Sequence, residues 1–198
     1  MKQVFLDNSM NLICKYQTFS DIDQKKLRYG LEGIYLTLTK TIVLLILSIC
    51  LNILKEFLLV LLFFNVIRYT GFGFHAKKSS QCLFMSILNF IVIPYTLFRI
   101  YIPANSIYVI LAICIIHFIL FAPADTIKRP LTNKRKRIIR KLLTIMIGLI
   151  YTFIIVFSHN EWISKILLTA MMVEAINIHP LLYKVFGQPY GNYKKIKH

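Results

Sequence analysis

Apolar residues fall in six blocks along the chain, separated by short polar stretches. The blocks cover residues 34–54, 57–67, 82–102, 107–122, 142–158 and 162–179. Most are roughly long enough to cross a hydrocarbon core of about 30 Å, where only helices and closed barrels satisfy the backbone. The pattern predicts an all-α, polytopic membrane helical bundle with about six transmembrane helices. The second block is short, and also fits a re-entrant or interfacial segment.

Other positions refine this outline. Residues 1–30 mix apolar and charged side chains, which is typical of an amphipathic segment on a membrane surface. Ser20, followed by Asp21 and Asp23, indicates a helix start. Pro94 predicts a kink within the third block. Because no internal repeat is present, we expect a single integral membrane domain over residues 1–198.

The charge distribution predicts a topology. The chain has 24 Lys and Arg against 8 Asp and Glu, a formal net charge of +16. These cations lie between apolar blocks, so a nucleic acid is not an expected partner. Of the 24, 20 fall on alternate connections that lie on one side of the membrane. The positive-inside rule places that side in the cytoplasm, next to anionic membrane lipids. It carries the N-terminal segment, the 69–81 loop, the basic 125–141 loop and the basic 187–198 tail.

The 69–81 loop and the start of the third block hold a candidate nucleophile, Cys82, and a candidate base, His75. In one straight helix these residues would lie about 10 Å apart, so a dyad requires a turn between them. The two serines at 79–80 predict a helix start that places Cys82 in the first turn. There the helix dipole, with Lys77 and Lys78, would favour the thiolate. An incidental His and Cys remain the alternative.

Other polar residues offer less specific chemistry. The four cysteines have no metal-ligand spacing, and neither a metal nor another cofactor is expected. Lys40 and Glu174 interrupt apolar blocks at a cost of roughly 2.5–3.5 kcal/mol each if unpaired. We expect each to face the bundle interior or lie near an interface, and a pair between the two is the alternative. The basic loop includes a cluster that sets topology and is also suited to bind an acidic peptide tail: Lys134, Arg135, Lys136 and Arg137.

The motif formed by Arg68, residues 73–77 and Cys82 resembles the accessory gene regulator protein B family, the membrane endopeptidases of Gram-positive quorum sensing. Residues 122–131 are similar to that family's central loop. The resemblance implies cleavage of a ribosomally made autoinducer precursor and formation of a cyclic thiolactone or lactone. It also implies that Cys82 is the nucleophile and His75 the base, that Arg68 and Gly73 shape the site, and that the protein is a homodimer.

Two other functions fit the same hydrophobic pattern. A small membrane peptide transporter or exporter would use polar residues along the spans, such as Lys40, Glu174 and His117. A non-catalytic membrane scaffold would need no reactive thiol. Both alternatives predict that Cys82 can be replaced without loss of function.

Overall fold

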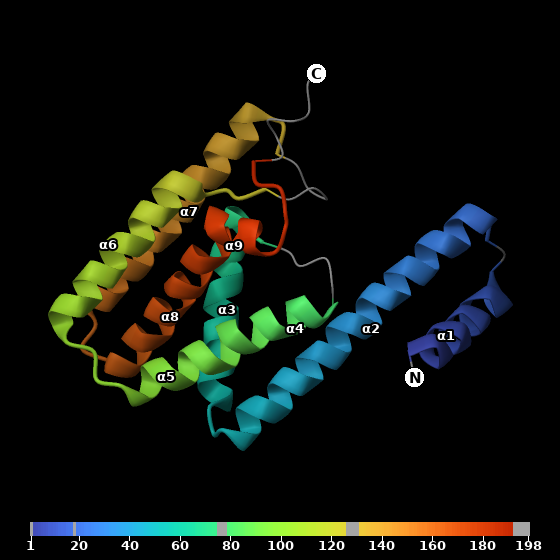
Figure 1. Cartoon of the computed structure of the whole chain (residues 1–198), viewed down its shortest axis with the longest axis horizontal. Helices are drawn as coiled ribbons and strands as arrows, with labels where there is room; N and C mark the ends of the chain where they lie inside the picture. Colours follow the sequence, from blue (N-terminus) through green and yellow to red (C-terminus); the bar gives the residue numbers. More distant parts are fainter. Residues whose placement is uncertain (1, 18, 75–78, 126–130, 192–198) are drawn as a thin grey trace. The chain divides into compact units, whose positions relative to one another are not determined.

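The computed structural model describes residues 2–17, 19–74, 79–125 and 131–191, and it is helical (Figure 1). Residues 2–50 form two helices, α1 (Lys2–Tyr16) and α2 (Asp21–Cys50). The remaining elements are α3 (Leu54–Gly71), α4 (Ser79–Ile87), a π-helix (Leu88–Val92), α5 (Ile93–Arg99), α6 (Ala104–Phe121), α7 (Lys134–Phe157), α8 (Glu161–Ile178) and α9 (Pro180–Val185). The all-α prediction is confirmed.

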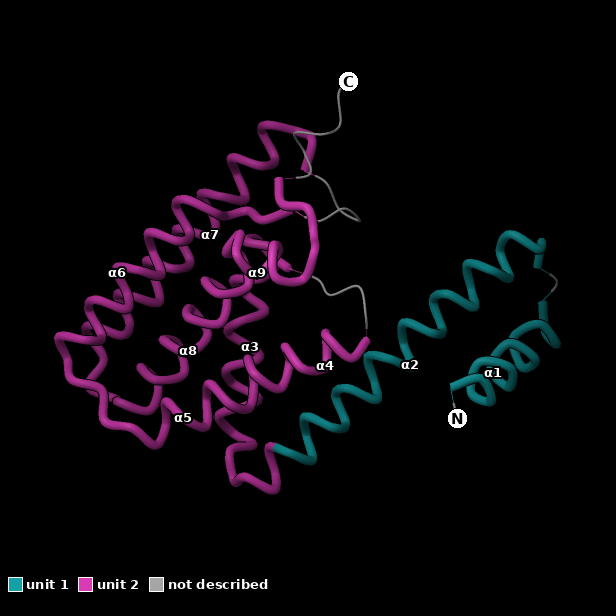
Figure 2. Tube along the Cα trace, in the orientation of Figure 1, with its two compact units in different colours: residues 1–47 teal, residues 48–198 magenta. Residues whose placement is uncertain are grey.

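The chain divides into two compact units, residues 1–47 and 48–198 (Figure 2). In the first unit, α1 runs antiparallel to the first half of α2. Lys2 Nζ lies 2.7 Å from Glu32 Oε1, and Arg28 Nη2 lies 3.0 Å from Asp7 Oδ1. The Ser20 hydroxyl oxygen accepts the Asp23 backbone N–H at 3.2 Å, which confirms the predicted helix start.

In the second unit, α3 and α8 pack against each other more extensively than any other described pair of helices. α6 and α7 pack against α8 and against each other, and α7 also contacts α3. Phe118, Leu168, Met171 and Ile178 are each at most 1% exposed and form part of one apolar core. The most buried helix is α8, with eleven buried residues among its 18.

The third apolar block is one continuous run from α4 through the π-helix to α5, with Pro94 in the first turn of α5. Proline lacks an N–H and clashes with the carbonyl four residues earlier, so an ordinary α-helical turn cannot hold it. The turn immediately before Pro94 is π-helical and therefore wider, and in it the Ile93 N–H bonds to the Leu88 carbonyl, five residues earlier. This wider turn leaves room for the proline ring, and no hydrogen bond from residue 94 is needed.

Four helical stretches within the described residues are long and apolar enough to cross a membrane: α2, α4 through α5, α6 and α7. The chain is therefore an all-α membrane protein. α3 and α8 each have 18 residues, but each also carries three charged side chains. For these two helices, and so for the total of six spans, the sequence pattern remains a prediction.

The polar connections of the second unit gather at its two ends. At one end, Arg140 Nη1 donates to the Tyr69 carbonyl at 2.7 Å. At the other end, Trp162 Nε1 donates to Glu56 Oε1 at 3.0 Å. Within the second unit, the described parts of the 69–81 and 125–141 stretches, which were predicted to share a side of the membrane, therefore lie at the same end.

The basic stretch predicted as a loop is partly helical. α7 begins at Lys134, and the Asn133 side chain caps it by accepting the Lys136 backbone N–H. Lys and Arg are good helix formers, and Ile138 and Leu142 continue an apolar face along this helix. The basic cluster of residues 134–137 therefore forms the first turn of α7. Its first three side chains are exposed, and that of Arg137 is half-buried.

Candidate functional site

The predicted site is only partly visible. His75, Lys77 and Lys78 lie outside the described residues. Arg68 and Gly73 are described at the C-terminal end of α3, and Cys82 is described in α4. The local geometry therefore comes from what surrounds the segment immediately before His75.

Residues 72–74 leave α3 as a short non-helical segment that two other parts of the chain hold in place. The Gly73 N–H donates to the Ala124 carbonyl and the Ala124 N–H donates to the Gly71 carbonyl, both at 2.9 Å. The Phe74 N–H donates to the Asn177 carbonyl in α8, also at 2.9 Å. Because backbone hydrogen bonds fix position and direction together, the chain entering residue 75 has a defined path.

Arg68 and Glu174 form a buried ion pair beneath this segment. Arg68 Nη1 lies 3.5 Å from Glu174 Oε2, and the two side chains are 16% and 0% exposed. Arg68 Nη2 donates to the Phe74 carbonyl at 2.5 Å. Within the second unit, the ion-pair partner of the Glu174 carboxylate is Arg68 on the neighbouring helix α3, and the suggested pairing with Lys40 of the first unit stays a prediction.

Two glycines make room for this ion pair. Gly73 has a φ of +116°, which disfavours any side chain, and a Cβ there would collide with the Arg68 guanidinium. A Cβ on Gly71 would lie 2.6 Å from Glu174 Oε1. These contacts give a physical basis for the prediction that Arg68 and Gly73 shape the site.

Cys82 is the fourth residue of α4 and is half-buried. The helix begins at Ser79, so the serines at 79–80 lie within its first turn, and Cys82 is close to the helix N-terminus as predicted. The π-helix that follows α4 reaches α8, where Asn89 Nδ2 donates to Asn177 Oδ1 at 3.3 Å. Among the described residues, no hydrogen bond joins Cys82 to Arg68, Gly73 or Glu174.

The basic end of α7 lies beside the same segment. Arg140 donates to the Tyr69 carbonyl, and its guanidinium carbon lies 4.5 Å from the ring centroid of Phe72. The cluster at 134–137 begins less than two helical turns before Arg140. The structure thus places this cluster at the site end of the second unit.

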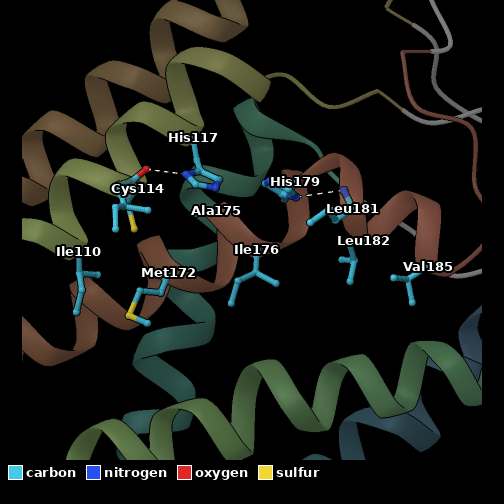
Figure 3. A pocket seen from close by; sticks show the side chains of 11 residues that line it. Ile110, Cys114, His117, Met172, Ala175, Ile176, His179, Leu181, Leu182 and Val185 are labelled. Atoms are coloured by element: carbon cyan, nitrogen blue, oxygen red, sulfur yellow. Dashed lines mark hydrogen bonds between the residues drawn. The ribbon is translucent and has the colours of Figure 1, made fainter.

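A cavity of about 480 Å³ lies between α6, α8 and α9 (Figure 3). Apart from two histidines, the wall is apolar. The ring centroids of His117 and His179 are 5.2 Å apart.

The cavity also brings a second cysteine near a histidine, because Cys114 lines it together with His117. The Cys114 residue is 2% exposed, whereas Cys82 is half-buried. His117 Nδ1 lies 2.8 Å from the Ile113 carbonyl, which can only accept, so this nitrogen carries a proton and is already engaged. Its setting suits a packed, hydrogen-bonded histidine.

Some site residues were not predicted from the sequence. Ala124 and Asn177 contribute through their backbone carbonyls, and a carbonyl leaves no signal in a side-chain pattern. Glu174 did leave a signal, since a carboxylate in an apolar block requires a partner. The sequence could not show that this partner is Arg68.

Comparisons with known proteins agree with this architecture. The family model described as "Accessory gene regulator B" matches residues 7–178. The chain is similar to an AgrB-like protein of Clostridium acetobutylicum, with 31% identity over 181 residues, covering 90% of this chain and 86% of the relative. It is similar to an AgrB-like protein of Listeria innocua, with 31% identity over 175 residues, covering 86% and 83% of the two chains.

A further relative is the Accessory gene regulator protein B of Staphylococcus aureus. It is 29% identical over 184 residues, covering 90% of this chain and 97% of the relative. No solved structure matches this chain.

Proposed function

The chain belongs to the accessory gene regulator B family, and on this premise we propose that it is a membrane cysteine endopeptidase of quorum sensing. Its substrate would be a ribosomally made autoinducer precursor peptide, from which it removes the C-terminal tail. The observation that carries the proposal is the family match over residues 7–178, which includes the whole motif from Arg68 to Cys82. In this assignment Cys82 is the nucleophile and His75 the base.

The reaction is an acyl transfer in two steps. His75 takes the proton of the Cys82 thiol, and the thiolate adds to the scissile carbonyl carbon. The C–N bond then breaks, and His75 gives the proton to the departing amine of the tail. The shortened peptide is left as a thioester on Cys82.

The second step closes a ring. A thiol or hydroxyl group within the bound peptide gives its proton to His75 and attacks the thioester carbon. The bond from this carbon to the Cys82 sulfur then breaks, the thiolactone or lactone is released, and the sulfur takes the proton from His75. Exchange of one thioester for another is nearly isoenergetic, so the thiolactone route needs no external energy source. A site at the membrane boundary helps to keep water from the thioester.

The geometry of the described residues supports these roles. Cys82 lies in the first turn of α4, where the partial positive charge of the helix N-terminus stabilises a thiolate. Three backbone hydrogen bonds and the Arg68 contact hold the segment that leads into His75. These contacts fix the chain as far as Phe74, the residue that precedes the proposed base.

We assign the protein to the cell membrane as a multi-pass protein, with both termini and the active site at the cytoplasmic side. The asymmetric distribution of cations favours this orientation. The grouping of the site segment and the start of α7 at one end of the second unit supports it.

The expected partners follow from the charge pattern and the family. Four cations in the first turn of α7 oppose the helix dipole, so helix stability does not explain them. We propose that they contact anionic lipid headgroups and the acidic tail of the precursor. A homodimer is proposed from the family alone.

The deciding experiment is to incubate the purified protein, in vesicles containing an anionic lipid, with the peptide encoded beside its gene. Mass spectrometry should find a shortened peptide and, on the protein, a peptide adduct at Cys82 that hydroxylamine removes. The Cys82→Ala variant is the control for both signals. Continued cleavage by that variant would reject the mechanism, and movement of intact peptide across the vesicle membrane would favour the transporter.

A further inference from the structure

We propose that Glu174 is a positioning residue for this reaction, acting through the Arg68 guanidinium to hold the backbone of Phe74, the residue immediately before His75. The inference rests on the proposed function, because it assigns a role in the activity of the His75–Cys82 dyad. It adds a side chain from α8 to a site whose other proposed side chains lie between Arg68 in α3 and Cys82 in α4.

The first argument is the cost of placing a carboxylate here. Glu174 is 0% exposed, and within the described part of the chain neither of its oxygens has a hydrogen-bond partner. Its interaction is the 3.5 Å ion pair with Arg68. A buried ion pair of this kind contributes little net stability, and apolar residues of similar volume often serve a fold equally well. Stability alone therefore gives no reason for this carboxylate.

The second argument is the way the guanidinium divides its contacts. Arg68 Nη1 faces Glu174, and Nη2 donates to the Phe74 carbonyl. The guanidinium is planar and rigid, so the direction of one nitrogen determines the direction of the other. A carboxylate that orients Nη1 therefore also orients the donor to Phe74.

The third argument is that α8 holds both polar groups of Phe74. The N–H of Phe74 bonds directly to the Asn177 carbonyl, while its C=O is held by Arg68, which Glu174 orients. Glu174 and Asn177 are three residues apart on α8, on one face of the helix. With both groups held, the backbone of Phe74 has a single direction, and Phe74 is the residue bonded to the proposed base.

The fourth argument is the space left for the pair. Side chains at positions 71 and 73 would collide with Glu174 and with Arg68 respectively. Because both residues are glycines, the backbone itself lies next to the ion pair. It is close enough for the charged groups to fix its conformation. We infer a coupling from Glu174 through Arg68 to Phe74 and its neighbour.

The test measures the reactivity of Cys82 without any peptide. In full-length protein in vesicles, Cys14 and Cys50 are replaced by serine and Cys114 by alanine, so that iodoacetamide reports on Cys82 alone. The alkylation rate is followed from pH 5 to pH 9. His75→Ala gives the profile of a thiol without its base.

We expect Glu174→Gln to lower the alkylation rate near pH 7 by about tenfold, towards the His75→Ala profile, because a displaced base loses its effect. In the cleavage assay kcat should fall with KM nearly unchanged. The matched control is Thr144→Val. Thr144 is equally buried and donates to Thr70 beside the site, but it does not contact Phe74, so its pH profile should be that of the parent.

A second variant covers the case in which Glu174→Gln leaves Arg68 uncompensated and the protein does not fold. Arg68→Gln with Glu174→Gln removes both buried charges, and should restore insertion while Cys82 remains slow. A parental pH profile in either folded variant would overturn the role of Glu174 and leave the proposed function standing. Equal profiles for the parent and His75→Ala would instead reject the dyad, and with it this inference.

Discussion

In the second unit, the inner helices α3 and α8 differ from the outer helices α6 and α7 in their burial and in the charged residues along their lengths. α3 and α8 each contain three charged residues and are packed on several sides. α6 and α7 are apolar along their spans, with only 17% and 22% of their most apolar windows buried inside the protein. The outer helices thus resemble the lipid that surrounds them, whereas the polar framework of the site lies on the inner ones.

This difference explains why hydropathy finds some helices better than others. A charge is tolerated within a membrane protein where other helices shield it from lipid and supply a partner. The same charges lower the mean hydropathy by which a membrane-spanning helix is recognised. The helices that carry the Arg68–Glu174 pair, α3 and α8, therefore have a weaker apolar signal than α6 and α7, and the predictions below test this contrast.

The largest expected effect comes from comparing Cys82 with the other three cysteines. Cys82→Ser and His75→Ala should each abolish cleavage with insertion unchanged, because they remove the nucleophile and its base. Replacement of Cys14, Cys50 and Cys114 together should leave cleavage intact. Peptide mass spectrometry measures both. A requirement for Cys114, which shares its cavity with His117, would move the chemistry to an outer helix.

The next largest effect comes from comparing Gly73, where a Cβ would collide with Arg68, with Gly33, where a Cβ would have room. Gly73→Ala should reduce kcat/KM by about 100-fold, because the new Cβ displaces Arg68 and the backbone conformation disfavours it. Gly33→Ala, where a Cβ would meet nothing within 4 Å, should be close to neutral. Cleavage kinetics at equal amounts of inserted protein give the comparison. Equal loss in both variants would show that the contact with Arg68 is irrelevant.

A smaller effect is expected at the basic turn of α7. Neutralising residues 134–137 to glutamine should raise KM by roughly three- to tenfold at low salt and change kcat less, because these charges bind the ground and transition states alike. The difference should shrink as salt increases. Orientation must first be verified by labelling introduced cysteines with an impermeant reagent.

The matched control for this turn neutralises Lys194, Lys195 and Lys197 in the basic tail. If the α7 variant has an unchanged KM across the salt series, the cluster serves topology alone. If the tail variant raises KM equally, the effect depends on the net charge of the protein and not on the position of the cluster.

The smallest effect is predicted on the outer surface. Leu149 in α7 is 52% exposed, and Leu149→Ala should alter the free energy of unfolding by less than about 0.5 kcal/mol. Leu168 in α8 is 1% exposed, and Leu168→Ala should cost about 2 kcal/mol or more through lost packing. Unfolding in detergent micelles measures both. Similar losses would mean that α7 is covered by protein in the native state.

Much of the fold was predictable from the sequence because apolar length and charge asymmetry act locally. The helix start at Ser20 and the disturbance at Pro94 both appear where the residues predicted them. The start of α7 within the basic stretch did not, because the charge pattern of a loop and of an exposed helical turn are alike. The division into two units has no counterpart in the residue pattern.

The site was predictable in its residue types and not in its arrangement. The motif identified Arg68 and Gly73, and an isolated carboxylate indicated that Glu174 had a partner. Pairing across helices depends on which faces meet, and a single sequence does not contain this information. Contributions made by backbone carbonyls, such as that of Asn177, have no residue type to recognise.

The contacts made by α8 also set the order in which this framework can form. During synthesis, α3 and the helix that bears Cys82 are made before α8. Until α8 follows, Arg68 lacks its carboxylate and the Phe74 N–H lacks its carbonyl. A nascent chain or one truncated before α8 therefore contains Arg68, Gly73 and Cys82 without the contacts that fix the segment between them. If the proposed function holds, we expect cleavage activity only in chains that include α8.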